Sequence, residues 1–285
     1  MASGILSARS RLVTVALLVA VMVLAGASTA FAVSIDTFAT RPVVAAAEAP
    51  NTWYVDRFKP AVFDSTWFNG GYRLRLGIAA SDFQGLGNFA ATQGRKYDLP
   101  AGTTMTQGDL YVGPDWNGAV ARRSDLWATA VDAQGATCGY PMIGFLNNPT
   151  AFSGTPAYTG FRCWDNNGWH NVAPAGGVVF GKWYTLKTVM SATKVDYYID
   201  GQVVYTSTFA SDPDMATAVQ YHDVMLQGYN FNSSYDIYWD NVWNVQPGPN
   251  PTITPASSPW SLALLALAGL AVVGVFQFKA KEARA

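Results

Sequence analysis

The chain contains very little glutamate, histidine or cysteine. Its 285 residues include two histidines and two cysteines, and no glutamate stands between Pro50 and Val245. Two histidines are too few for a transition-metal site built on imidazole ligands. The sequence also lacks a Gly-x-Ser-x-Gly elbow and a glycine-rich loop before Lys-Ser/Thr. These absences argue against serine hydrolases and against phosphate-binding enzymes of those classes.

Positive charge is scarce in the middle of the chain. Residues 33–250 hold 13 Lys and Arg against 17 Asp and one Glu, a net charge of −5, whereas each end carries an excess of positive charge. Binding to a phosphate backbone needs a basic surface. We therefore expect no nucleic-acid partner.

The same middle region has the composition of strands and turns. It is rich in Trp, Tyr and Phe, and in Gly, Asn, Thr and Ser. Val195, Tyr197 and Ile199 alternate with polar residues, the period of a strand with one buried face. Asp200-Gly201 then separates this run from a second one, which is a strong signal for a type I′ hairpin.

Two further runs show the same alternation. In residues 72–78, Leu74 and Leu76 face one way and two arginines the other. In residues 235–245, the pattern places five apolar side chains on one side of a final strand: Tyr235, Ile237, Trp239, Trp243 and Val245. We therefore predict an all-β fold, an antiparallel jelly-roll β-sandwich over residues 51–246.

The amino-terminal segment has the pattern of an export signal. Arg9 and Arg11 precede an apolar run over residues 12–27, and Ala30-Phe31-Ala32 matches the A-x-A cleavage pattern. Residues 1–32 are predicted to be a signal peptide, with an uncleaved signal anchor as the alternative. Residues 33–50 show no clear period, so we expect an irregular lead-in.

The carboxyl-terminal segment has the pattern of a membrane anchor. Residues 247–259 form a proline-rich linker, and residues 260–278 are a run of 19 residues without charge, long enough for a transmembrane helix. The tail, 279–285, is basic, and the positive-inside rule places it in the cytoplasm. The sandwich is thus predicted to be exported and held extracytoplasmically at the membrane.

Cys138 and Cys163 are the only cysteines. In an exported chain an isolated pair is more often bridged than free, so we expect a disulfide. Inside and just after this loop, aromatic residues alternate with amide and carboxylate residues, a composition that suits the apolar face and hydroxyl rim of a sugar. The alternative is that they are turn formers and core residues. The candidate glycan-binding residues here are Tyr140, Trp164, Asp165, Asn166 and Trp169.

Arg73 and Arg75 lie on the polar side of the strand at 72–78. Two arginines on an open sheet face can bind an anionic sugar or a carboxylate bidentately, so we include both among the ligand-binding candidates. The alternative is that they lie on a solvated face and pair with nearby aspartates.

Three segments of the chain resemble a known fold family. The succession WYTLK, VDYYIDGQVVY and YDIYWDNVWNV is similar to the last strands of concanavalin A-like and laminin-G-like jelly rolls, many of which bind or cleave polysaccharides. In several such domains a final-strand aspartate helps to hold a structural calcium. The resemblance implies this role for Asp240, with Asp56 opposite, although an aspartate that caps a turn would account for either.

The carboxyl-terminal segment resembles bacterial sorting signals of the exosortase type. Pro255, Ser258 and Trp260 fall at the spacing of the Pro, Ser and Trp in the version Ile-Pro-Thr-Leu-Ser-Glu-Trp, although Ser257 and Pro259 replace its Leu and Glu. This resemblance implies a sorting enzyme as a possible partner.

The absence of glutamate between Pro50 and Val245 argues against catalysis by a pair of glutamates. Jelly-roll glycosidases of the resembling clan use two glutamates on one strand, and the paired aspartates available, Asp196 with Asp200 and Asp236 with Asp240, lie at strand ends or turns. We therefore expect a non-catalytic carbohydrate-binding or surface protein with an extracellular glycan as partner. The alternatives are a purely structural surface protein and a polysaccharide lyase. Candidates for the lyase are Arg73, Arg75, His170 and His222.

Overall fold

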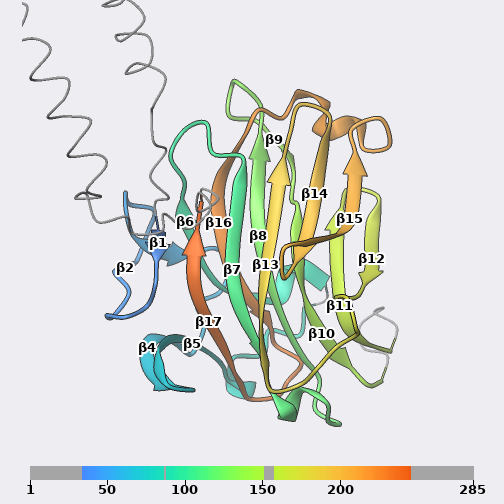
Figure 1. Cartoon of the computed structure of the whole chain (residues 1–285). Coiled ribbons are helices and arrows are strands. Elements are labelled where there is room, and N and C mark those ends of the chain that lie inside the picture. The colour runs from blue at the N-terminus through green and yellow to red at the C-terminus, as the bar shows by residue number, and fades with distance from the viewer. Residues whose placement is uncertain (1–33, 87, 151–156, 245–285) are drawn as a thin grey trace, which may run out of the picture. The chain divides into compact units, whose positions relative to one another are not determined.

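A computed structural model describes residues 34–86, 88–150 and 157–244. Two β-sheets lie face to face, and the described residues contain four short 3-10 helices but no α-helix (Figure 1). The predicted all-β antiparallel sandwich is confirmed, with one short parallel pair, β2 with β3, at the edge of one sheet.

The eight-stranded sheet contains β15 (Gln202–Thr208), β14 (Lys194–Ile199), β13 (Lys182–Met190), β7 (Met105–Val112), β17 (Tyr235–Trp243), β5 (Gly71–Ile78) and β4 (Val62–Phe68) in this order, with β1 (Ser34–Asp36) paired to β17. The nine-stranded sheet contains β12 (Gly168–Val172), β11 (Tyr158–Asp165), β10 (Met142–Asn148), β8 (Arg122–Val131), β16 (Gln220–Tyr229), β6 (Thr92–Asp98), β3 (Trp53–Val55) and β2 (Val44–Ala45), with β9 (Thr137–Gly139) paired to β8. The 3-10 helices are η1 (Ala80–Asp82), η2 (Asn88–Ala91), η3 (Pro114–Trp116) and η4 (Pro213–Thr217).

The main core fills the space between the two sheets. Leu74, Leu110 and Trp239 of the eight-stranded sheet pack with Leu126 and Phe161 of the nine-stranded sheet, and all five are fully buried. Each side chain comes from the apolar half of an alternating strand, so the other half of each strand faces outward. The two outer faces are therefore free to carry polar and aromatic side chains.

The predicted hairpin is present. Ile199 of β14 pairs with Gln202 of β15, and the backbone φ angles of Asp200 and Gly201 are 49° and 79°. Positive φ at both central residues is what a type I′ turn requires. The Asp200 side chain also links the turn to β13, because it accepts a hydrogen bond from the Thr185 backbone N–H at 3.0 Å.

The final strand departs from its predicted pattern at a bulge. The pairing of β17 shifts between Asp240 and Trp243, where Asn241 has a φ of 47°. The extra residue turns Val242 into the core, whereas Trp243 is only partly buried. The prediction that Trp243 faces the core is therefore wrong, while Ile237 and Trp239 before the bulge are buried as expected.

The predicted disulfide is also wrong, because both cysteines are free. Cys163 of β11 points into the core and is fully buried. Cys138 of β9 is only partly buried, and its thiol lies 3.4 Å from Thr217 Oγ1. Burial raises the pKa of the Cys163 thiol well above its usual value, which keeps it protonated and unreactive.

The segment expected to be an irregular lead-in contributes the strands β1 and β2. The predicted signal peptide (1–32), linker (247–259), transmembrane helix (260–278) and tail (279–285) lie outside the described residues, as does the sorting motif. Among the described residues, no helix is long and apolar enough to cross a membrane.

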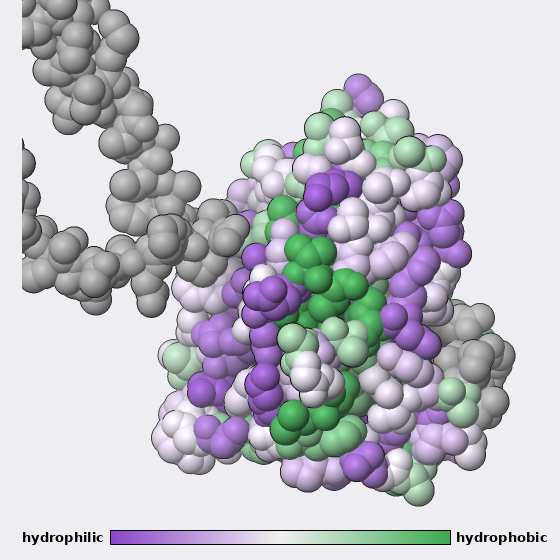
Figure 2. Space-filling model, turned by 45° about the vertical axis from the view of Figure 1, so that its right-hand side comes forward, coloured by the Kyte–Doolittle hydropathy of each residue, from purple (hydrophilic) through white to green (hydrophobic). Residues whose placement is uncertain are grey.

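The edge strands β15 and β12 lie on the same side of the sandwich (Figure 1). Seen toward this side, hydrophobic side chains form a band between hydrophilic ones (Figure 2). In these two strands, Val172 and Val204 pack against the core, and Val203 is half exposed. The band therefore closes the core where neither sheet has a further strand to cover it.

Candidate functional site

A row of polar side chains crosses the outer face of the nine-stranded sheet. Strand pairing places Arg162 of β11, Gly144 of β10, Asp125 of β8 and Gln227 of β16 side by side, followed by Gly94 of β6. We call these five residues the polar row. Their neighbours along the strands point into the core, so the polar row faces outward.

Two glycines give the polar row its shape. A Cβ at Gly144 would overlap the Asp125 carboxylate and the Ser124 backbone, and a Cβ at Gly94 would overlap Gln227 and the Leu226 carbonyl. Any other residue at these positions would displace the polar side chains. The absence of both side chains therefore leaves room for the Asp125 and Gln227 side chains beside them.

A row of large apolar side chains lies beside the polar row. Trp164, Met142, Trp127 and Met225 follow one another across β11, β10, β8 and β16, and Trp169 of β12 pairs with Trp164. We call these five the aromatic row, which forms a second apolar cluster separate from the main core. Aromatic rings beside fixed polar groups are the usual composition of a sugar-binding surface.

Phe89 of η2 lies over this surface. Its ring centroid is 5.4 Å from that of Trp127, 4.9 Å from that of Trp164 and 5.9 Å from that of Trp169. The Arg123 guanidinium lies 5.7 Å from the same ring. Phe89 thus occupies the centre of the aromatic row, where a flat apolar ring is stabilised on several sides.

Two arginines and one aspartate are buried at the centre of the face. Arg123 Nε forms an ion pair with Asp125 Oδ2, and both side chains are nearly inaccessible to solvent. The Arg162 guanidinium lies 3.6 Å from the centroid of the Trp169 ring. Burial, and then the nearby charge of Arg123, lowers the pKa of Arg162 to about 9, so Arg162 still carries its charge at neutral pH.

Several buried polar atoms of this face have no hydrogen-bond partner among the described residues. They are Arg123 Nη2, Asp125 Oδ1, Trp127 Nε1, Arg162 Nε and Gln227 Oε1. Buried polar atoms are normally hydrogen-bonded, because leaving one unpaired costs about 1–3 kcal/mol. Five such atoms, on three strands of one face, therefore lie close together without a hydrogen-bond partner among the described residues.

Asp56 and Arg57 extend this face beyond Gly94. Gln227 Nε2 donates to Asp56 Oδ2 at 2.7 Å, and Arg57 Nη1 donates to the same oxygen at 2.8 Å. The Arg57 guanidinium lies 5.2 Å from the centroid of the Trp127 ring. The face therefore presents two carboxylates, Asp125 and Asp56, on opposite sides of Gln227.

Some of the residues singled out from the sequence lie on this face. Trp164 and Trp169 belong to the aromatic row and are only partly buried. Tyr140 lies at its border, with 38% of its surface exposed and its ring centroid 6.4 Å from that of Trp127. The structure thus brings three of the predicted glycan-binding residues together, and their binding role remains a prediction.

Asp165 and Asn166 form hydrogen bonds with other residues of the protein. Asp165 accepts hydrogen bonds from Tyr205 at 2.8 Å and lies 3.0 Å from His170 Nε2. Burial acts to raise the pKa of Asp165, but these hydrogen bonds outweigh it and lower the pKa. Asn166 Nδ2 donates to Asp212 at 2.9 Å. Both residues hold together the end of the sandwich near β12 and β15.

Arg73 and Arg75 lie on the outer face of the opposite, eight-stranded sheet. Arg73 forms an ion pair with Asp240 at 3.1 Å, and Arg75 forms one with Asp236 at 2.9 Å. This is the arrangement of the alternative interpretation, in which the arginines pair with aspartates. Neither arginine lies near the aromatic row, so the predicted ligand-binding set is split between two faces.

The predicted calcium pair is not brought together. Asp56 lies beside Gln227 of the nine-stranded sheet, whereas Asp240 contacts Arg73 on the other side of the sandwich. No group of three or more His, Cys, Asp or Glu side chains within the described ranges could hold a metal ion. The two aspartates thus have cationic or amide partners in place of a shared ion.

The sequence did not single out Asp125, Arg123, Arg162 or Gln227. The one available signal was the outward half of the strand at 124–131, where polar Asp125 alternates with buried Leu126 and Ala128. Which residues of other strands lie beside Asp125 depends on strand register, and the sequence pattern does not specify that.

Comparisons with known proteins give matches to solved structures alone. No family model matches the chain, and no curated protein sequence matches it. A glycosyl hydrolase family protein 16 from Mycobacterium smegmatis is 16% identical over 76% of this chain and 100% of its own, with a TM-score of 0.43. The Crh5 transglycosylase without ligand is 14% identical over 75% of this chain and 92% of its own, with a TM-score of 0.41.

A sialidase is 13% identical over 73% of this chain, with a TM-score of 0.39, but the match spans only 18% of the sialidase. These identities are below 25% and these TM-scores are below 0.5, so the likenesses carry no argument about the activity or the ligand of this chain. They do not support our prediction of a non-catalytic binding or surface protein, because several of the similar structures are named as hydrolases or transglycosylases.

Proposed function

We propose that the protein is an enzyme that cleaves or transfers glycosidic bonds, and that its sugar chain lies along the polar row. The observation that carries this proposal is the set of buried, unpartnered polar atoms around Asp125, next to the aromatic row. The rings would stack on the sugars, and the polar atoms would bind the sugar hydroxyls.

Asp125 and Asp56 are the carboxylates that can serve this chemistry. Cleavage of a glycosidic bond develops positive charge on the sugar ring and needs a proton on the departing oxygen. In the proposed reaction Asp56 carries a proton on Oδ1, while Oδ2 keeps its hydrogen bonds from Gln227 and Arg57, and Asp56 donates that proton as the C–O bond breaks. Asp125 removes a proton from the attacking water or sugar hydroxyl, whose oxygen bonds to the anomeric carbon. The two aspartates would take the place of the glutamates that the sequence lacks.

For this reaction to occur, the side chains of Phe89 and Trp169 must move aside. Asp125 is only 1% exposed, and the Phe89 and Trp169 rings lie against its ion-pair partner Arg123. A sugar can reach the carboxylate once the Phe89 ring leaves the centre of the aromatic row. Phe89→Ala is therefore expected to keep or raise activity.

The test is incubation of the full-length protein with laminarin, mixed-linkage β-glucan, chitin oligosaccharides and alginate, with products detected as new reducing ends and by mass spectrometry. Asp125→Asn should lower the rate by roughly a hundredfold or more. Asp196→Asn is the matched control, since Asp196 lies on the opposite sheet and pairs with Lys194. Absence of product from every glycan, or full activity of Asp125→Asn, would contradict the proposal.

A further inference from the structure

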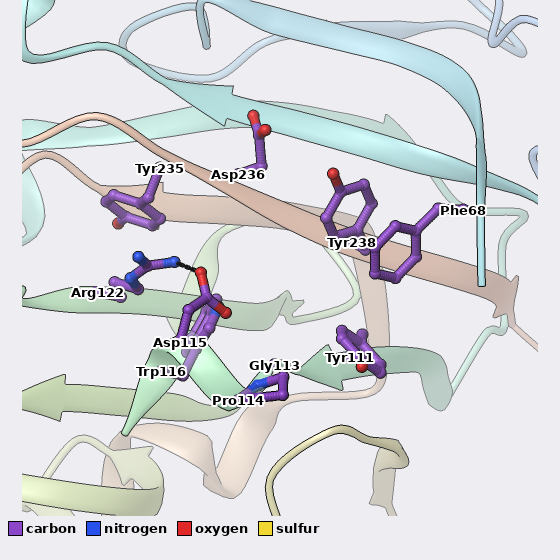
Figure 3. Close-up of a pocket in the computed structure, with 10 residues that line it drawn as sticks. All are labelled: Phe68, Tyr111, Gly113, Pro114, Asp115, Trp116, Arg122, Tyr235, Asp236 and Tyr238. Atoms are coloured by element: carbon purple, nitrogen blue, oxygen red, sulfur yellow. Dashed lines mark hydrogen bonds and ion pairs between the residues drawn. The ribbon is translucent and has the colours of Figure 1, made fainter. Parts of the chain in front are cut away.

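A hollow lies where residues of both sheets meet η3. It has a volume of about 460 Å³ and is bordered by β4, β7, β17, η3 and the first residue of β8 (Figure 3). We call it the β7/β17 cleft. Its lining residues include Phe68, Tyr111, Asp115, Arg122, Asp236 and Tyr238. Binding sites for small ligands commonly have volumes of about 300–1,000 Å³.

One wall of the cleft is aromatic. The rings of Phe68 and Tyr238 are stacked with their centroids 3.6 Å apart, and the Tyr111 centroid lies 5.0 Å from that of Phe68. Figure 3 shows these three rings grouped on one side of the cleft. Tyr111 and Tyr238 come from the outward halves of β7 and β17, because their strand neighbours are buried in the core.

The opposite wall is charged. Arg122 forms an ion pair with Asp115, shown as a dashed line in Figure 3, and the Asp115 side chain remains 61% exposed. The glycine at position 113 leaves space for Asp115 Oδ1, which a Cβ there would meet. The cleft thus sets aromatic rings against an exposed carboxylate and the largely buried guanidinium that pairs with it.

The charges around the cleft cancel. Asp115 pairs with Arg122, and Asp236 pairs with Arg75 at 2.9 Å. The cleft therefore has no net charge that would attract a charged ligand. An uncharged ligand with many hydroxyl groups would find both hydrogen-bond donors and acceptors there. A pyranose sugar has this chemistry, with an apolar C–H face for the rings and hydroxyls for the charged wall.

We propose that the β7/β17 cleft is a second carbohydrate-binding site, specific for an uncharged pyranose chain and separate from the polar row. Two separate sites would hold a polymer at two points, which raises its apparent affinity without a new contact at the reacting bond. The binding does not depend on catalysis at Asp125.

Calorimetric titration of the full-length Asp125→Asn protein tests the proposal, because this variant is expected to leave the sugars intact. The probes are laminarihexaose, cellohexaose, chitohexaose and maltohexaose. Tyr238→Ala, added to Asp125→Asn, should weaken binding at the cleft about tenfold for at least one probe. Asp115→Ala should have a similar effect and serves as a second variant if Tyr238→Ala fails to fold, as judged by its thermal melting curve.

Tyr198→Ala is the control for these variants, since Tyr198 is a half-buried tyrosine of β14 that lines no part of the cleft. Unchanged binding of all four probes by Tyr238→Ala and Asp115→Ala, or no binding of any probe to the parent protein, overturns the proposal. Failure of the catalytic proposal would appear separately, as absence of product with the cleft still able to bind.

Discussion

At the scale of single residues, Gly144 is needed for the position of Asp125 in the polar row, because the Asp125 carboxylate occupies the space that a Cβ at Gly144 would take. Gly144→Ala must therefore push the β8 backbone or the carboxylate aside. Overpacking of this kind costs about 1–3 kcal/mol, which corresponds to roughly 2–12 °C in melting temperature for a domain of this size. We expect a lowered melting temperature, measured by circular dichroism, together with loss of glycan cleavage.

Gly118→Ala is the matched control, because the nearest atom to a Cβ there is the Asp115 carbonyl oxygen at 3.4 Å, an ordinary contact. Equal melting temperatures for the two variants would show that Gly144 does not shape the polar row.

Asp223 of β16 gives a prediction about pH. Burial raises its pKa, and this effect outweighs the hydrogen bond from Thr129 and the nearby charges of Lys96 and His222. A carboxyl group with a raised pKa favours the folded state more as it becomes protonated. Its contribution to stability is complete below the ordinary value of 3.8 and is lost as pH rises through the folded-state pKa. Urea unfolding at pH 7, 5.5 and 4 should show wild type gaining stability relative to Asp223→Asn as pH falls.

The contribution of Asp196 of β14 to stability should depend on pH in the opposite direction. Burial acts to raise its pKa, but hydrogen bonds from Lys194 and Thr206 outweigh this effect and lower the pKa. Its contribution is present at neutral pH and is lost as pH falls through the folded-state pKa, so wild type should lose stability relative to Asp196→Asn. If both variants changed in the same direction, burial would not be the cause at Asp223.

At the scale of elements, the β14–β15 hairpin depends on its turn. Gly201 has a φ of 79°, and a Cβ there would meet no atom within 4 Å. Gly201→Ala therefore tests backbone conformation alone, and a left-handed alanine costs about 1–2 kcal/mol. We expect this decrease in the free energy of unfolding, measured with urea. A loss as small as that of Gly118→Ala would mean that the turn is not under conformational constraint.

Alternation predicted the strands well where pairing is regular. Val195, Tyr197 and Ile199 are buried as the period of two requires, and the Asp-Gly pair marks the turn. The prediction failed at Trp243, because the bulge at Asn241 adds one residue and reverses the faces after it. Asn tolerates positive φ, but the residue type alone does not tell a bulge from a regular strand position.

At the scale of the whole molecule, the candidate site is assembled from strands far apart in the sequence. Asp125 and Gln227 are direct partners although about a hundred residues separate them. The sequence predicted Trp164 and Trp169 because both lie in one aromatic stretch. It could not predict their placement beside Asp125, since that depends on the order β11-β10-β8-β16 in the sheet. For the same reason Arg73 and Arg75 were grouped with residues of the other face.

The pairing of β1 with β17 joins the first and last strands of the described fold, with Ser34 opposite Trp243. The two ends of the folded region are therefore neighbours. A short peptide could connect them, and new ends could be opened at the exposed Asp200–Gly201 turn without breaking any strand. Such a circular permutant would keep both outer faces intact and could be fused to a carrier at the opened hairpin.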